Sequence, residues 1–206
     1  MSPRPADPSI AAIAADAAGC ADATALALAI RSCVACDELA AAREQVVVGD
    51  VIAGAKLVIV GEAPGANEDA EGRPFIGKGG QLLDRLMAEA GLRRSETSVL
   101  NVLKCRPPSN RTPTRAEAAR CTGWLDRQIA LLDPWLVMTL GRSALTWAMS
   151  STVTLADVRG KVHDWRDRRL IASYHPSAAL RFGPNGDPHA ALAADLRFVA
   201  EVLACA

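Results

Sequence analysis

The sequence predicts an α/β fold, a three-layer α/β/α sandwich with a central, mainly parallel four-stranded sheet. Short apolar runs recur along the chain, helical stretches separate the first three of them, and unusual residues follow the end of each run. Alternating strands and helices are typical of a parallel sheet that helices cover on both faces. The chain has 206 residues, 50% of them hydrophobic, which is enough for one well-packed core. We therefore expect a single domain over residues 1–206.

The N-terminal part of the chain is rich in alanine and poor in β-branched residues, a composition that is typical of helices. We therefore expect a helical N-terminal segment over residues 1–45. The valines at positions 46–48 then begin the first β-like run.

Apolar runs of strand length and longer helical stretches define the remaining elements. The expected strands are residues 57–60, 99–103, 136–140 and 170–173. The expected helices are residues 79–90, which Gly91 closes, 114–132, which Asp133 and Pro134 close, 143–149 and 188–203. Residues 153–165, between the third and fourth strands, are expected to form an irregular or hairpin insert.

The charge balance limits how the chain meets other molecules. Lys plus Arg and Asp plus Glu number 23 each, so the chain as a whole is not drawn to nucleic acid or to anionic lipid. A contact with DNA must therefore use a local basic patch. No apolar stretch is long enough to span a bilayer, and the N-terminal segment lacks the regions of a signal peptide. We expect a cytoplasmic protein that engages no membrane.

Motif residues follow the end of each expected strand. The segment GEAPG at residues 61–65 follows the first strand, Asn101 lies near the end of the second, Gly141 follows the third, and His175 follows the fourth. In open α/β sheets ligands bind at the carboxyl ends of the strands, so we expect these groups to converge on one site. Alone, GEAPG would indicate no more than a tight turn between a strand and a helix.

The motifs taken together resemble those of a known enzyme family. After residues 61–65 the chain continues with ANED at 66–69 and GRPF at 72–75, and as far as Leu83 it resembles the first motif of the family 4 uracil-DNA glycosylases. The likeness continues through NVLKCRPP at 101–108, NRTP at 110–113 and HPSA at 175–178, in the same order and at similar spacing. The resemblance implies an enzyme that flips uracil out of DNA and hydrolyses its N-glycosidic bond, leaving an abasic site.

Base recognition by such an enzyme requires an apolar stacking face and a polar edge reader. Phe75 is expected to supply the stacking face, with Gly61 and Ala63 beside it in the uracil site. The Asn101 amide offers one donor and one acceptor, which match uracil O4 and N3–H and mismatch cytosine. Without the neighbouring motifs, Asn101 would be read as a strand-end residue that caps a turn.

Bond cleavage needs groups that stabilise charge on both fragments. His175 is expected to donate a hydrogen bond to uracil O2, where negative charge develops, although an isolated His is more often structural. Glu62 is the first candidate to orient the attacking water and to stabilise the cationic sugar, and Glu68 is the second. The resemblance also implies a steric role for Glu68, against uracil C5, that excludes thymine. The alternative is that both acids are solvated loop charges.

DNA contacts are expected from the loops around this site. Ser177 and the segment that ends in Leu180 and Arg181 resemble a loop that enters the minor groove, with Leu180 as a wedge and Arg181 as a phosphate or base contact. Otherwise Leu180 would pack in the core. Phosphate contacts are expected from the cations near the site, which are Lys78, Lys104, Arg106, Arg111 and Arg115.

The cysteines form two pairs, Cys33 with Cys36 and Cys105 with Cys121. Four thiolates brought together by a fold suit either a [4Fe–4S] cluster or structural zinc, and the wide second pair is unlike a zinc ribbon. The resemblance implies a [4Fe–4S] cluster at these positions, with a structural role. Cys20 and Cys205 are expected to be incidental thiols.

Two other functional classes are possible. A non-catalytic iron–sulfur protein of this fold would bind DNA without cutting it, but Glu62, Asn101 and His175 argue against that reading. A nucleotide-binding protein would need a GxGxxG or GxxxxGK[ST] motif, which the sequence lacks. A related subgroup traps its product through a His in a basic insert after the second strand, and this insert is absent. We therefore expect a monomeric, monofunctional hydrolase that acts on uracil in single- or double-stranded DNA.

Overall fold

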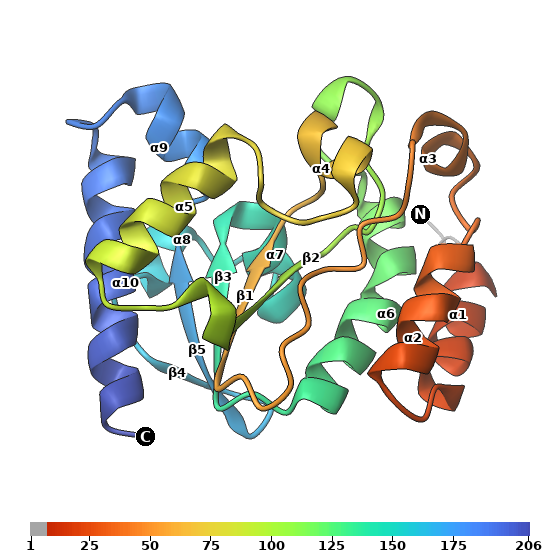
Figure 1. Ribbon diagram of the computed structural model, residues 1–206, viewed down its shortest axis with the longest axis horizontal. Coiled ribbons are helices and arrows are strands. Elements are labelled where there is room, and N and C mark those ends of the chain that lie inside the picture. The colour runs from red at the N-terminus through yellow and green to blue at the C-terminus, as the bar shows by residue number, and fades with distance from the viewer. Residues whose placement is uncertain (1–7) are drawn as a thin grey trace.

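The computed structural model describes residues 8–206 and shows a central sheet covered by helices on both faces (Figure 1). The strands are β1 (Leu57–Gly61), β2 (Thr97–Asn101), β3 (Leu136–Leu140), β4 (His163–Trp165) and β5 (Arg168–Ser173). Their order in the sheet is β2-β1-β3-β5-β4, with parallel pairing except between β4 and β5. The expected α/β fold is confirmed.

The main helices lie where amphipathic stretches predict them. They are α5 (Lys78–Glu89), α6 (Arg115–Leu132), α7 (Gly141–Ala148) and α10 (Asp187–Ala204). Thr114 and Glu117 form a capping box that begins α6, and Asp133 ends this helix in a left-handed conformation. Gly91, with a φ of 78°, follows α5 as expected.

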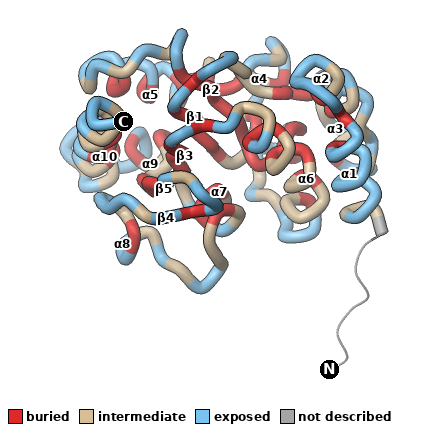
Figure 2. The backbone as a smooth tube through the Cα atoms, turned by 90° about the horizontal axis from the view of Figure 1, so that it is seen from below, coloured by how far each residue is buried: buried red, intermediate tan, exposed pale blue. Residues whose placement is uncertain are grey.

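Alternation along the buried strands creates two cores. Leu57 and Ile59 face α5 and α10, whereas Val58 and Val60 face α6 and α7. All residues of β1, which lies between β2 and β3 in the sheet, are buried (Figure 2, red). A strand that is buried on both faces reads as a continuous apolar run, which is why the sequence reveals it.

Three helices precede the sheet. They are α1 (Pro8–Gly19), α2 (Ala23–Ser32) and α3 (Asp37–Ala42), and α1 and α2 pack on the outer side of α6 (Figure 1). The first part of the expected N-terminal segment, residues 1–7, lies outside the described residues. In the described part of the chain, no helix is long and apolar enough to cross a membrane.

The sheet has five strands, so the expected count of four is wrong. The additional strand, β4, lies inside the 153–165 insert and pairs antiparallel with β5. Arg166 and Asp167 connect the two strands with φ values of 46° and 62°. Two consecutive positive φ values are typical of a tight hairpin turn. The insert thus contributes one strand of a hairpin whose other strand, β5, lies outside it, so the hairpin alternative is only partly met. Three residues are too few to show a strand period.

Other boundaries differ for similar reasons. Residues 46–48 form no strand, although the Val47 amide donates a 2.8 Å hydrogen bond to the Lys104 carbonyl. β2 ends at Asn101, two residues earlier than expected, and beyond it the amides of Val102 and Leu103 donate to the carbonyls of Gly61 and Glu62. The shorter helical elements, which the sequence did not predict, are α4 (Ala66–Glu71), η1 (Arg94–Glu96), η2 (Pro108–Asn110), α8 (Leu155–Val158) and α9 (Pro176–Phe182).

Candidate active site

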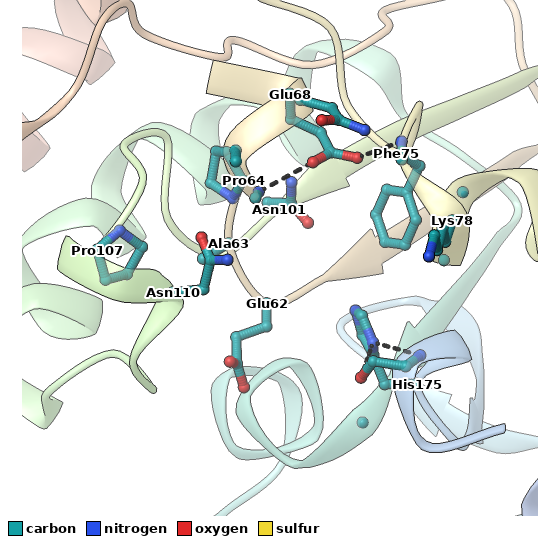
Figure 3. A pocket seen from close by; sticks show the side chains of 18 of the residues that line it. Glu62, Ala63, Pro64, Glu68, Phe75, Lys78, Asn101, Pro107, Asn110 and His175 are labelled. Carbon is teal, nitrogen blue, oxygen red and sulfur yellow. Dashed lines mark hydrogen bonds between the residues drawn. The ribbon is translucent and has the colours of Figure 1, made fainter. Parts of the chain in front are cut away.

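A cavity of about 540 Å³ lies at the carboxyl ends of the parallel strands. Side chains from four different segments of the chain surround it, among them Glu62, Phe75, Asn101 and His175 (Figure 3). This is the size of a typical small-ligand site. The predicted residues that line the cavity are Glu62, Ala63, Glu68, Phe75, Lys78, Asn101, Arg111, His175 and Ser177.

Gly61 lies beneath the cavity and allows two other residues to approach. A Cβ at position 61 would lie 2.3 Å from Cζ of Phe75 and 2.6 Å from Oδ1 of Asn101. Both distances are too short for any side chain at this position. The glycine is therefore required for the Phe75 ring and the Asn101 amide to lie against the end of β1.

Phe75 is held in an unusual backbone conformation. Its φ is 54°, in a region that bulky residues rarely occupy. A Cβ at Gly80 would lie 1.7 Å from the Phe75 carbonyl oxygen, so only glycine at position 80 permits this arrangement. Phe75 is 7% exposed, and its ring lies 5.7 Å from the His175 ring, centroid to centroid. Strain of this kind is typical of functional sites.

Asn101, the last residue of β2, carries an unsatisfied polar atom. Its side chain is buried, and its Oδ1 atom accepts no hydrogen bond from any described residue. An acceptor that is buried without a partner costs about 1–3 kcal/mol. Because Asn101 lines the cavity, a ligand that carries an N–H donor would satisfy this atom.

His175 begins α9, and its ring is oriented by that helix. Its Nδ1 accepts a 3.2 Å hydrogen bond from the Ser177 amide and lies 2.9 Å from the Ser177 hydroxyl oxygen. Burial lowers the pKa of His175 to about 4, against a smaller opposing effect of Glu68. The ring is thus neutral at pH 7. Because Nδ1 accepts, the single ring proton is on Nε2, which makes that atom a donor.

The two candidate carboxylates have different surroundings. Glu62 points away from Asn101 and Glu68 (Figure 3), and its Oε2 accepts a 2.5 Å hydrogen bond from the Ser143 hydroxyl. Glu68 accepts from the amides of Gly65, Ile76 and Gly77 at 3.1, 2.9 and 2.8 Å. The Glu68 carboxylate therefore joins the beginning of α4 to the loop that carries Phe75.

Lys104 does not lie where a phosphate contact requires it. The side chain is 2% exposed, and its Nζ donates a 2.9 Å hydrogen bond to the Asn101 carbonyl. The expected phosphate contact of Lys104 is corrected for this reason, since a buried ammonium cannot reach DNA. Lys104 instead lies between the end of β2 and the cysteines.

The other predicted DNA-contacting residues lie on the surface or at its edge. Arg111 binds Glu117 through both terminal nitrogens, at 2.9 and 2.7 Å, and this ion pair lowers the pKa of Glu117 to about 2. The Arg106 Nε donates to the Asn110 side chain at 2.8 Å. Lys78 and Arg115, like Arg181, are exposed. Leu180 is 44% exposed, so it does not pack in the core.

Four cysteines line a second cavity, between the N-terminal helices and α6. They are Cys33, Cys36, Cys105 and Cys121. Arg43 donates to the Cys105 sulfur at 3.0 Å, and burial raises the pKa of Cys121 to about 12. Among residues 8–206, no three His, Cys, Asp or Glu side chains form a ready site for a single metal ion.

The donor set of this second cavity fits an iron–sulfur cluster. Its four thiols are accompanied by the cations Arg43, Lys104 and Arg120, which would offset most of the charge of four thiolates. Apolar side chains such as Ile30 and Trp124 complete the wall. By contrast, Cys20 lies outside this cavity, where its thiol donates to the Asp16 carbonyl, and Cys205 is exposed.

The structure adds residues that the sequence did not single out. Ser143 and Arg142 follow β3, and Arg142 lines the cavity with Asn67 and Asn110. The position of Ser143 after the third strand was an available signal. Its hydrogen bond to Glu62 depends on the packing of α7, which the sequence does not reveal.

Comparison with known proteins places this architecture in a family. The uracil DNA glycosylase superfamily matches residues 48–197. The type-4 uracil-DNA glycosylase of Thermotoga maritima is 42% identical over 74% of this chain and 80% of its own length. Those of Sulfurisphaera tokodaii and Archaeoglobus fulgidus are each 41% identical, over 69% and 73% of this chain and 69% and 79% of their own lengths. The chain therefore belongs to the uracil DNA glycosylase superfamily and, within it, to the type-4 family.

Proposed function

We propose that this chain excises uracil from DNA by hydrolysing the N-glycosidic bond, with the cavity at the carboxyl ends of the sheet as the uracil site. The observation that carries the proposal is the buried Asn101 Oδ1, which has no partner among the described residues and lies beside the Phe75 ring. An unsatisfied acceptor next to an aromatic face suits a flat base with an N–H edge.

Uracil recognition follows from this pair of residues. The base stacks on Phe75, its N3–H donates to Asn101 Oδ1, and its O4 accepts from Asn101 Nδ2. Cytosine would place an acceptor at N3 against Oδ1 and an amino group against Nδ2, so both contacts would be lost. Ala63 completes the wall of the uracil site, and Gly61 supports it from behind, against Phe75 and Asn101.

Departure of the base is assisted by His175. When the bond between N1 and C1′ breaks, its electron pair moves to the uracil ring and negative charge collects on O2. The Nε2–H of neutral His175 donates to that oxygen, and the Ser177 amide holds the ring in orientation. A neutral imidazole is suited to this role, because it donates a hydrogen bond without releasing a proton to the base.

Attack by water requires a carboxylate near the sugar. Glu62 supports the deoxyribose cation and orients the water, while Ser143 fixes one carboxylate oxygen and leaves the other available. The Glu68 carboxylate holds the loop that carries Phe75, because it accepts hydrogen bonds from three backbone amides. From that position Glu68 can crowd the C5 position of the base.

The surface around the cavity binds DNA. Arg181 and Lys78 are exposed cations that contact phosphates, and Arg106, Arg111 and Arg115 extend the same basic rim. Leu180 fills the space that the flipped nucleotide leaves, and Ser177 contacts the backbone beside it. This basic rim can bind either single- or double-stranded DNA.

Cys33, Cys36, Cys105 and Cys121 hold a [4Fe–4S] cluster. When bound, the cluster supplies a structural cross-link between the N-terminal helices and the segment after β2. Residues 1–206 then act as one glycosylase domain, in which the N-terminal segment contributes Cys33 and Cys36. We infer that the domain acts as a monomer.

A cleavage assay tests the proposal. An end-labelled oligonucleotide with one uracil is incubated with the protein and divided, and half is treated with alkali. We expect strand cleavage only after alkali, with no product from matched thymine or cytosine oligonucleotides. Cleavage without alkali would reveal lyase activity. DNA binding without any cleavage would favour the non-catalytic iron–sulfur alternative.

A further inference from the structure

A buried carboxylate lies behind the turn that carries His175. Asp195, on α10, is 2% exposed, and its neighbours Leu192, Leu196 and Val199 belong to the apolar core. Acidic side chains are rarely buried to this extent unless they are paired, because desolvation of the charge is costly. Asp195 forms no part of the cavity, so its burial needs another reason.

The Asp195 carboxylate joins three segments of the chain. Its Oδ2 accepts a 2.6 Å hydrogen bond from the Ser173 hydroxyl. Arg159, which follows α8, donates from Nη2 to Oδ1 and Oδ2 at 3.1 and 3.2 Å, and to the Ala191 carbonyl at 3.3 Å. The end of β5, the 153–165 insert and α10 therefore meet at this one side chain.

Ser173 links this network to the active site. It is the last residue of β5, and only Tyr174 separates it from His175. The Arg159 guanidinium lies 5.7 Å from the centre of the Tyr174 ring. Ser173 therefore binds Asp195 directly, and Tyr174 contacts Arg159, which itself binds Asp195.

The opposite side of the same turn is fixed by β3. Ser173 pairs with Leu140 in the sheet, and a Cβ at Gly141 would lie 2.9 Å from the His175 Cβ. Because Gly141 has no side chain, the His175 Cβ can lie close to the segment that follows β3. Asp195 on α10 would hold the same turn from the opposite side, through Ser173.

We propose that Asp195 is a positioning residue that fixes the His175 backbone through Ser173. This inference rests on the proposed function, because it assigns His175 the donor role. Ser177 sets the direction of the imidazole ring, and Asp195 sets the place from which the ring extends. A donor to a developing oxyanion is effective only when it is held in place before the reaction.

The test is a double-mutant comparison. Ser173→Ala and Asp195→Asn are each made in the natural chain and in a His175→Ala chain, and uracil release is measured in single turnover. In the natural chain we expect each substitution to slow release by about 10- to 100-fold, the range that a misplacement of about 1 Å produces. In the His175→Ala chain the same substitutions should change the rate by less than about twofold, since the residue they position is gone.

Controls separate positioning from a general loss of stability. Glu201→Gln removes an exposed acid from the same helix and should leave the rate unchanged. DNA affinity, measured by titration, should stay within about twofold for every variant, because positioning acts in the transition state. If Asp195→Asn fails to fold, Ser173→Ala still tests the proposal, since it removes only one hydroxyl.

The failures of the two proposals are distinguishable. Equal rate losses in the natural and His175→Ala chains would overturn the positioning role and leave uracil excision intact. A natural chain that releases no uracil would overturn the proposed function and this inference together. Loss that is confined to the natural chain supports both.

Discussion

The Lys104 ammonium donates a 2.9 Å hydrogen bond to the main-chain oxygen of Asn101, the residue whose side chain lines the cavity at the carboxyl ends of the strands. The same lysine lines the cavity of the four cysteines and is 2% exposed. One buried cation thus connects the proposed cluster site to the residue that we propose reads the base. A buried charge of this kind is stable only with a compensating partner, which four thiolates would supply.

Replacement of Lys104 should therefore affect both regions. Lys104→Met is expected to lower kcat/KM for uracil excision by about tenfold, because the Asn101 carbonyl loses a charged hydrogen-bond donor. Iron content should fall in the same variant. Lys161→Met, at an exposed lysine far from the cysteine cavity, is the matched control. Unchanged excision and full iron content in Lys104→Met would show that the lysine serves neither region.

Replacement of Asn101 tests base selection. Asn101→Asp presents acceptors alone, which repel uracil O4 but suit the cytosine amino group. We expect uracil excision to fall by about 10² and the ratio of cytosine to uracil excision to rise. Parallel assays on oligonucleotides that carry each base give this ratio. If uracil excision were unchanged, Asn101 would not read the base.

The protonation of His175 predicts a particular pH dependence. Its pKa is lowered to about 4 by burial, whereas an unfolded chain has the ordinary His value of about 6.5. The unfolded state then binds the proton first, so the contribution of His175 to the free energy of unfolding should be constant above about pH 6.5 and should decrease between about pH 6.5 and 4. An NMR titration of the three histidines, with His175→Gln for assignment, checks this expectation. A His175 resonance that titrates near the ordinary His value would contradict it.

The cysteine assignment predicts a defined metal content. Protein purified without oxygen should contain iron and sulfide and absorb broadly in the visible range. Cys121→Ser should lose iron, while Cys205→Ser, at an exposed thiol outside the cavity, should retain it. Stoichiometric zinc without iron in the natural chain would refute the cluster.

The sequence predicts the central fold well because its strands are buried on both faces. The strand at Leu136–Leu140 has the expected bounds. The C-terminal ends of α5 and α6 lie where Gly91 and Asp133 predict them, because both residues adopt the positive φ that ends a helix. β4 escapes prediction because a three-residue strand depends on its partner β5 rather than on its own pattern. The six-residue helix α4 depends in the same way on Glu68, which binds amides at residues 76 and 77.

The sequence predicts a site residue wrongly where a residue type that is usually exposed is buried. Lysine is normally exposed, so a lysine between two motifs suggests a phosphate contact. Only the tertiary structure shows that Lys104 is 2% exposed and lies beside Cys105 and Cys121 inside the protein. The Glu62 partner Ser143 and the Ser173 partner Asp195 are equally invisible, because 81 and 22 residues separate the members of these pairs.

The most direct test of the account compares catalysis with binding in one variant. His175→Ala removes the donor that we propose acts mainly on charge in the transition state, and loss of such a donor typically slows reaction by about 10²–10³. Uracil release in single turnover should therefore fall by this factor, while affinity for uracil-containing DNA stays nearly constant. Arg181→Ala, at an exposed cation on α9, should show the opposite bias and lose affinity. A His175→Ala protein that loses binding in proportion to activity would contradict the account.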